Sequence, residues 1–308
     1  MRAGTIVTGG LSVTPQYYVQ YRQITAKNYT SRYKCSIKIG ESLRCPYDHS
    51  MRAGFHRIGC AALCALAISL VGAAPASAQT DEIQVYDATI DPPGQFSLEL
   101  HHNYTPIGRT QPDFPGGITP NHALNGVAEW AYGVADWFEL GVYLPLYTLS
   151  GGHLQFNGGK LRALFVVPNA RQRTFFYGIN FELSFNAHQW EQTHKSGEIR
   201  PILGEHLGPW DFIVNPIIDT GFNGIRKLDF APAERVAYNF SSVWAGALEH
   251  YADFGYLSDI APLKRQAQTA FLVVDYNGDP NSVEFGIGHG FTDASDSLVL
   301  KLMITHEF

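Results

Sequence analysis

Apolar and polar residues alternate along most of the chain after residue 95, and the clearest example lies at residues 175–185. One parity there is apolar throughout and consists of Phe175, Tyr177, Ile179, Phe181, Leu183 and Phe185. The other parity is mostly small or polar and includes Gly178, Asn180, Glu182 and Ser184. Successive side chains of a strand point to opposite faces of a sheet, so the pattern predicts a strand with one apolar and one polar face.

The same alternation predicts twelve strands. They lie near residues 96–105, 123–133, 137–147, 158–168, 174–186, 198–207, 210–222, 230–239, 243–253, 266–276, 282–291 and 297–308. Most are close to the ~9–11 residues that a tilted strand needs to cross a bilayer. No segment after Ala78 has the apolar run of ~18 residues that a membrane helix needs.

The predicted connections are of unequal length. Those after even-numbered strands are short, at residues 134–136, 169–173, 208–209, 240–242 and 277–281. Most of those after odd-numbered strands are long and rich in Gly and Pro, at residues 106–122, 148–157, 187–197 and 254–265. Outer-membrane barrels show this inequality, with tight periplasmic turns and longer outside loops. An even number of strands places both termini in the periplasm, and the chain ends on an aromatic residue, Phe308.

A water-soluble β-sandwich or lipocalin-type barrel would also alternate. A soluble barrel exposes its charges, however, whereas one face of most strands here is nearly uncharged. Aromatic residues gather near strand ends, as in the interfacial girdles of membrane barrels: Trp130, Tyr132, Trp137, Tyr147, Tyr177, Trp210, Trp244 and Tyr251. We therefore predict an all-β protein, a transmembrane antiparallel up-and-down β-barrel of about 12 strands with short periplasmic turns and longer extracellular loops.

The N-terminal quarter predicts export. From Met51 a short basic start precedes an apolar run at residues 58–71, which ends before Ala76-Ser77-Ala78. This layout is typical of a secretory signal peptide at residues 51–78, cleaved after Ala78. A signal peptide must be N-terminal to be read, so residues 1–50 are interpreted as a non-native upstream extension without a fold. Residues 79–95 would form a periplasmic segment or a plug, and residues 96–308 the barrel in the cell outer membrane.

Cysteine and charge both divide at the predicted cleavage site. All four cysteines precede Ala78, so the mature chain has no disulfide framework and no Cys-based metal or redox site. The mature chain carries thirteen Lys and Arg against twenty-six Asp and Glu, a net charge of −13. Nucleic acid is therefore excluded as a partner. The expected partners are outer-membrane lipid, a small-molecule solute and, during biogenesis, the barrel-assembly machinery.

Three stretches resemble hairpins of a known family, at residues 132–146, 243–254 and 291–302. They begin Tyr-Gly-Val-Ala-Asp-Trp-Phe, Val-Trp-Ala-Gly-Ala-Leu-Glu and Phe-Thr-Asp-Ala-Ser-Asp-Ser. Together they resemble the outer-membrane transporter family named for the meta-pathway of phenol degradation, over most of the mature chain. The resemblance implies a barrel channel; it identifies architecture better than substrate and carries no catalytic set.

If the apolar parity faces lipid, the other parity lines the lumen. The charged residues of that parity are Glu99, Glu129, Glu139, Lys160, Arg162, Glu182, Arg200, Asp219, Glu249, Asp275, Glu284 and Lys301. On the lipid side each would be expensive, about 2–4 kcal/mol for Arg or Lys at the midplane. They form either a salt-bridge network that braces the wall or a charged constriction that selects solutes. A twelve-strand barrel is expected to enclose a narrow, partly occupied pore.

The sequence favours a channel for a small solute, with a charged and mostly acidic lumen, over two alternatives. An outer-membrane lipid or ester hydrolase would need a His paired with a Ser and an orienting acid, and no His of the mature chain has a recognisable spacing. His101 and His102 point to opposite faces of their strand and cannot bind one ion together. No catalytic residue, metal site or cofactor is assigned. The second alternative is a structural barrel plugged by its N-terminal segment or its long loops.

Overall fold

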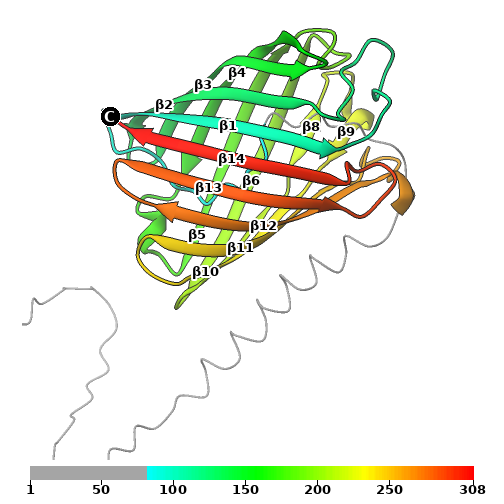
Figure 1. The fold of residues 1–308 in the computed structure, drawn as a ribbon. Helices are drawn as coiled ribbons and strands as arrows, with labels where there is room; N and C mark the ends of the chain where they lie inside the picture. Colours follow the sequence, from blue (N-terminus) through cyan, green and yellow to red (C-terminus); the bar gives the residue numbers. More distant parts are fainter. Residues whose placement is uncertain (1–81) are drawn as a thin grey trace, which may run out of the picture. The chain divides into compact units, whose positions relative to one another are not determined.

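The computed structural model describes residues 82–308, which form a barrel (Figure 1). The predicted upstream extension at residues 1–50 and the signal peptide at residues 51–78 lie outside the described residues. Within the described part, no helix is long and apolar enough to cross a membrane.

Strands make up most of the barrel, with three single-turn 3-10 helices between them. The strands are β1 (Phe96–Ile107), β2 (Leu124–Ala135), β3 (Phe138–Ser150), β4 (His153–Val166), β5 (Phe175–Asn186), β6 (Lys195–Leu207), β7 (Trp210–Asn215), β8 (Ile218–Thr220), β9 (Leu228–Phe230), β10 (Ala233–Asn239), β11 (Trp244–Asp253), β12 (Ala267–Asn277), β13 (Asn281–Gly290) and β14 (Leu298–Glu307). The 3-10 helices are η1 (Ala170–Gln172), η2 (Ile225–Lys227) and η3 (Leu263–Arg265).

The strands close into a ring in which every neighbour is antiparallel. β1 pairs with β14, and β5 pairs with β6. These two pairings close the described sheet, so neither leaves a free edge. β7 and β8 both pair with β6 and together form one strand of the barrel wall, which is interrupted at Pro216. β9 and β10 together form a second such strand, which is interrupted at Pro232 because proline has no N–H group for the hydrogen-bond ladder. The fourteen labelled strands therefore make a closed barrel of twelve strands, which confirms the predicted fold.

The connection predicted at residues 148–157 is wrong. β3 and β4 continue their pairing through Thr148 with Gln155 and Leu149 with Leu154, and only Gly151-Gly152 forms the turn. Both glycines have positive φ angles, 58° and 79°, which favour glycine in a tight hairpin. What looked like a Gly-rich loop in the sequence is a projecting hairpin.

The alternation of Phe138, Leu140, Val142 and Leu144 predicts that Leu146 also faces lipid, and this prediction is wrong. The register shifts between Tyr143 and Leu146, because Leu144 and Pro145 both face outward at a bulge. Leu146 is consequently fully buried inside the barrel beside Val127 and Tyr143, rather than on the lipid-side parity. A single extra residue in one strand reverses the parity of everything that follows it.

Apart from this bulge and the Glu234–His250 pair, which has the outward parity of β10 and β11, the outer wall is apolar. Residues of the outward parity are the exposed large hydrophobic residues of the strands, including Leu140, Leu161, Phe181, Leu248, Leu272 and Ile287. The inward parity of the same strands carries the buried polar residues, including Glu129, Asn180, Glu182, Glu249 and Lys301. A soluble barrel would have the opposite arrangement.

Gly158 tests the packing of the seam between β4 and β5. A Cβ atom at Gly158 would lie 1.9 Å from the carbonyl oxygen of Phe185, and its φ is 124°. We expect Gly158→Ala to lower the free energy of unfolding by more than the ~1–2 kcal/mol of a left-handed backbone alone. Urea unfolding of the refolded protein measures this change. The control is Gly152→Ala, where φ is 79° and no atom lies within 4 Å; equal losses for the two variants would contradict the close approach.

Candidate functional site

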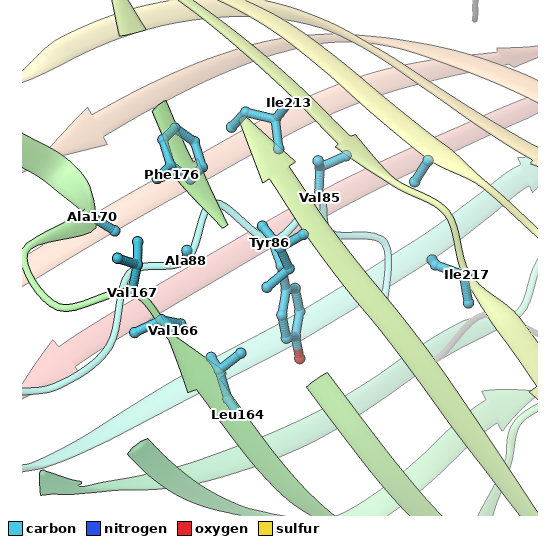
Figure 2. Close-up of a cluster of buried hydrophobic side chains, with 12 residues drawn as sticks. Val85, Tyr86, Ala88, Leu164, Val166, Val167, Ala170, Phe176, Ile213 and Ile217 are labelled. Carbon is cyan, nitrogen blue, oxygen red and sulfur yellow. The ribbon is translucent and has the colours of Figure 1, made fainter. Parts of the chain in front are cut away.

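Residues 82–95 run through the interior of the barrel. At one end, the Gly94 amide donates to the Gly133 carbonyl near the end of β2 at 2.7 Å. At the other, the Lys301 ammonium of β14 donates to the Ile83 carbonyl at 3.1 Å. Figure 2 shows Val85, Tyr86 and Ala88 of this segment among side chains of the surrounding strands. We call residues 82–91 the lumen segment.

Tyr86 anchors the lumen segment. Its amide donates to Asn215 Oδ1 at 2.7 Å, and Asn215 Nδ2 donates to its carbonyl at 3.0 Å, so one wall side chain satisfies both backbone groups. Its hydroxyl lies 2.6 Å from the Tyr143 hydroxyl. The guanidinium of Arg200 lies 4.4 Å from the centre of its ring and that of Arg162 5.7 Å, both within cation–π range.

An apolar strip of the inner wall faces the lumen segment. Val85, Tyr86 and Ala88 of the segment belong to one buried cluster with wall residues Leu164, Val166, Val167, Ala170, Phe176, Ile202, Ile213, Ile217 and Ala233 (Figure 2). Full burial of a valine side chain is worth about 1.5–3 kcal/mol. The segment therefore covers apolar wall surface that would otherwise face an aqueous lumen.

The buried charged side chains of the interior form three groups. Arg235 of β10 forms ion pairs with Glu249, Asp275 and Glu284. Lys301 lies 2.5 Å from both Glu249 and Glu284. This first group joins β10, β11, β12, β13 and β14, and it surrounds each cation with carboxylates.

The second group belongs to β1–β4. Arg162 lies 2.8 Å from Glu129 and 2.5 Å from Glu139. His101 Nε2 lies 3.2 Å from carboxylate oxygens of both Glu99 and Glu129. Glu139 also accepts a hydrogen bond from the amide of Asp91 at 2.5 Å, which ties the lumen segment to this group.

The third group belongs to β4–β6 and again includes the lumen segment. Lys160 lies 3.2 Å from Glu182, and Arg200 lies 2.7 Å from Glu198 and 3.1 Å from Glu82. Asp219 of β8 is half-buried, opposite Glu198 in the ladder on one side and Asp229 on the other. The twelve sequence-predicted residues are thus all buried or half-buried, and all except Asp219 take part in one of the three groups.

Sequence reasoning missed several members of these groups, namely Glu82, Tyr86, His101, Tyr143, Glu198 and Arg235. The assignment of Tyr251 to the interfacial girdle is wrong, because Tyr251 faces inward and its hydroxyl donates to Glu249 at 2.7 Å. Arg235 lies in β10, just after the break at Pro232, where the alternation of apolar and polar residues is too irregular to assign Arg235 to the inner face. His101 and Tyr143 have the inward parity in the sequence, and buried polar residues of that parity were a usable signal. No periodic signal marked Glu82 or Tyr86, because the lumen segment has no regular secondary structure.

Two outer loops fold over one mouth of the barrel. Ile118, from the loop after β1, and Trp190, from the loop after β5, pack with the inward-facing Val127, Tyr143 and Leu146. Nearby, Arg109 pairs with Asp113 and, at 3.2 Å, with Asp296 from the loop after β13. Burial lowers the pKa of Arg109, but the two carboxylates outweigh it and the pKa is raised. The charge of Arg109 thus holds loops from opposite ends of the chain together.

At the other mouth, near the C-terminus, the interior opens into a cavity of about 270 Å³. The lumen segment forms part of its lining. The lining as a whole is strongly acidic, with Asp87 and Asp91 of the segment and Glu99, Glu129, Glu139, Asp211, Asp275, Glu284 and Glu307 of the wall against Arg162, Arg171 and Arg235.

Two imidazole–carboxylate pairs lie outside the three charged groups. His206 Nδ1 is 2.6 Å from Asp211, and His250 Nδ1 is 2.9 Å from Glu234. The other nitrogen of His250 contacts Gln268 at 2.8 Å. Within residues 82–308, neither imidazole is hydrogen-bonded to a serine hydroxyl, so neither pair supports the hydrolase alternative.

Fold and lumen define a closed β-barrel filled by its own N-terminal segment, and comparisons with known proteins give no closer identity. No family model matches the chain, and no curated protein matches it. The resemblance to the phenol meta-pathway family therefore stays a prediction.

Several solved structures are similar in fold. The COG4313 outer membrane channel from Pseudomonas putida F1 is 11% identical, with a TM-score of 0.49, and the match covers 74% of this chain and 100% of that one. The KdgM porin is 10% identical, with a TM-score of 0.45, over 69% and 99%. LpxR from Salmonella typhimurium is 7% identical, with a TM-score of 0.36, over 69% and 100%. Likenesses at this level say nothing about activity or solute.

Arg162 tests the second charged group. Its removal leaves Glu129 and Glu139 buried without their shared cation, so we expect Arg162→Met to lower the free energy of unfolding by about 3–5 kcal/mol. Urea unfolding in detergent micelles measures the loss. Arg171→Met is the control, because Arg171 makes only an exposed hydrogen bond to Thr89. A loss below 1 kcal/mol for Arg162→Met would show that the carboxylates do not depend on it.

Proposed function

We propose that this chain is an outer-membrane channel for small cationic solutes, partly closed by its own lumen segment. The observation that carries the proposal is the acidic cavity of about 270 Å³ inside a closed barrel whose outer wall is apolar. The solute class, the membrane and the closing role of the segment are parts of one proposal, and each has its own support.

The apolar outer wall supports a membrane location. Hydrocarbon accepts the outward Leu161, Leu248 and Leu272, whereas water would leave them as a large exposed patch. Closed barrels satisfy all their backbone groups between strands, which is the condition for crossing a bilayer with strands. The predicted signal peptide gives a route of export to the outer membrane.

The charge of the cavity supports cations. Nine acidic side chains and three arginines line it, so the cavity has an excess of negative charge. Rings of acidic side chains favour cations in pores, and low-dielectric walls concentrate the effect. At about 270 Å³ the cavity lies below the usual range of drug-sized ligand pockets, which favours a small solute.

The way the lumen segment is held supports a closing role. It is bound by hydrogen bonds, ion pairs and two apolar clusters, and it has no strand pairing with the wall. Asn215 and Tyr143 hold Tyr86, Arg200 holds Glu82, and Lys301 holds the Ile83 carbonyl. A segment bound only through side chains and isolated backbone groups can leave without disturbing the barrel ladder.

The membrane location predicts a depth-dependent cost for charge on the outer wall. We expect Leu272→Arg to lower the stability of the barrel in lipid vesicles by about 2–4 kcal/mol, because Leu272 is 71% exposed in the middle of β12. Phe240→Arg is the control, since Phe240 is 70% exposed but lies in the turn after β10, where we expect about 0–1 kcal/mol. Reversible folding in urea with vesicles measures both. Equal costs would contradict a bilayer around β12.

The closing role predicts that loss of the Tyr86 anchor opens the channel. We expect Tyr86→Ala to raise single-channel conductance in planar bilayers, because it removes the contacts with Tyr143, Arg162 and Arg200. Tyr104→Ala, on the outer wall, is the control and should not change conductance. In a salt gradient the reversal potential should show a preference for K⁺ over Cl⁻. An absence of channel events in both wild type and Tyr86→Ala, or a preference for Cl⁻, would refute the proposal.

A further inference from the structure

Three side chains of the second charged group converge on one point of the inner wall. Glu99 of β1 and Glu129 of β2 are directly opposite each other in the antiparallel ladder. His101 lies two residues along β1 from Glu99 and therefore on the same face. The His101 ring is fully buried, and its Nε2 atom lies between the two carboxylates. One atom from each residue lies within 4.8 Å of the other two.

The distances suit a shared cation. Nε2 is 3.2 Å from Glu99 Oε1 and 3.2 Å from Glu129 Oε2. One N–H group cannot point at both oxygens, so a proton alone serves this arrangement poorly. If an ion lies about 2.1 Å from two ligand atoms that are 3.2 Å apart, the ligand–ion–ligand angle is roughly 100°. This angle lies between the octahedral and tetrahedral values.

The local charges also call for a cation. Like charges directly opposite each other on a sheet are destabilising. Glu129 shares the single guanidinium of Arg162 with Glu139. Glu99 has only neutral donors besides His101, namely Gln84 at 3.0 Å and Thr305 at 2.6 Å. Glu99, Glu129 and Glu139 thus have one permanent cation, Arg162, among them. The uncompensated negative charge lies where His101 Nε2 contacts Glu99 and Glu129.

We propose that Glu99, His101 and Glu129 bind one divalent transition-metal ion, with Zn²⁺ as its representative. His101 Nε2, Glu99 Oε1 and Glu129 Oε2 are the three protein ligands. Imidazole and carboxylate suit zinc and related ions, and three protein ligands leave positions for water. Glu99 and Glu129 both line the acidic cavity, which gives the ion a route to the site.

The same geometry sets the expected behaviour of the site. Because a metal takes the Nε2 lone pair, protons compete with the metal for it, and binding strengthens as the pH rises. His101 Nδ1 is buried without a hydrogen-bond partner, whereas ligating histidines normally donate this N–H to an acceptor. The site is therefore expected to bind zinc reversibly rather than to retain it permanently.

The test is a zinc titration of residues 79–308, which contain no cysteine, isolated in detergent and stripped with a chelator. Isothermal titration calorimetry should show one site, and Co²⁺ substitution should give visible absorption bands. We expect His101→Gln and Glu99→Gln each to weaken zinc binding at least ~10-fold, the loss that even outer-shell partners cause. His250→Gln is the control, because His250 is bound to Glu234 and Gln268 away from the site.

Heat-modifiable gel migration establishes that each variant is folded before its titration is interpreted. Zinc affinity that is equal in wild type, His101→Gln and Glu99→Gln would overturn the proposal, as would an absence of zinc binding by the wild type. Loss of binding in His250→Gln alone would also overturn it. The outcome is independent of the conductance proposal, since zinc binding is measured without a membrane and conductance without zinc.

Discussion

A closed barrel gives every strand residue only two directions, and ionised side chains must take the inward one where hydrocarbon lies outside. The rest of this structure depends on that constraint. Thirteen basic residues and twice as many acidic ones have to be accommodated in the mature chain. Each basic residue of the three charged groups is paired with at least one carboxylate, and Arg235 is paired with three, those of Glu249, Asp275 and Glu284. The pairing is incomplete, and the surplus gives the cavity its negative charge.

The lumen segment contacts both the apolar strip and the charged groups of the inner wall. Its Val85 and Ala88 cover the apolar strip of the wall, while Glu82 and the Ile83 carbonyl engage Arg200 and Lys301. Removal of the segment would expose the strip to water and leave these cations with fewer partners. The barrel wall therefore stabilises the segment inside the lumen. In the proposed channel, water or a solute has to replace these contacts when the segment leaves.

The outward or inward direction of most strand residues could be predicted from period-two alternation, because parity alone separates Phe181 from Glu182 and Leu302 from Lys301. The twelve strands followed from the same signal. Alternation failed where the backbone departs from a regular strand. The outward pair Leu144 and Pro145 reversed the side of Leu146, and the break at Pro232 obscured Arg235. The position of Tyr86 had no local signal, because tertiary contacts alone determine it.

The central claim is that the apolar parity meets hydrocarbon and the charged parity does not. Every cysteine of the chain precedes the predicted cleavage site, so single cysteines can be introduced into the mature part without interference. Nitroxide labels at positions 271–275 of β12 in vesicles would report access to oxygen, which concentrates in lipid, and to a water-soluble nickel chelate. The account predicts high oxygen access at 272 and 274 and low access at 271, 273 and 275. The reverse phase, or no alternation, would contradict it.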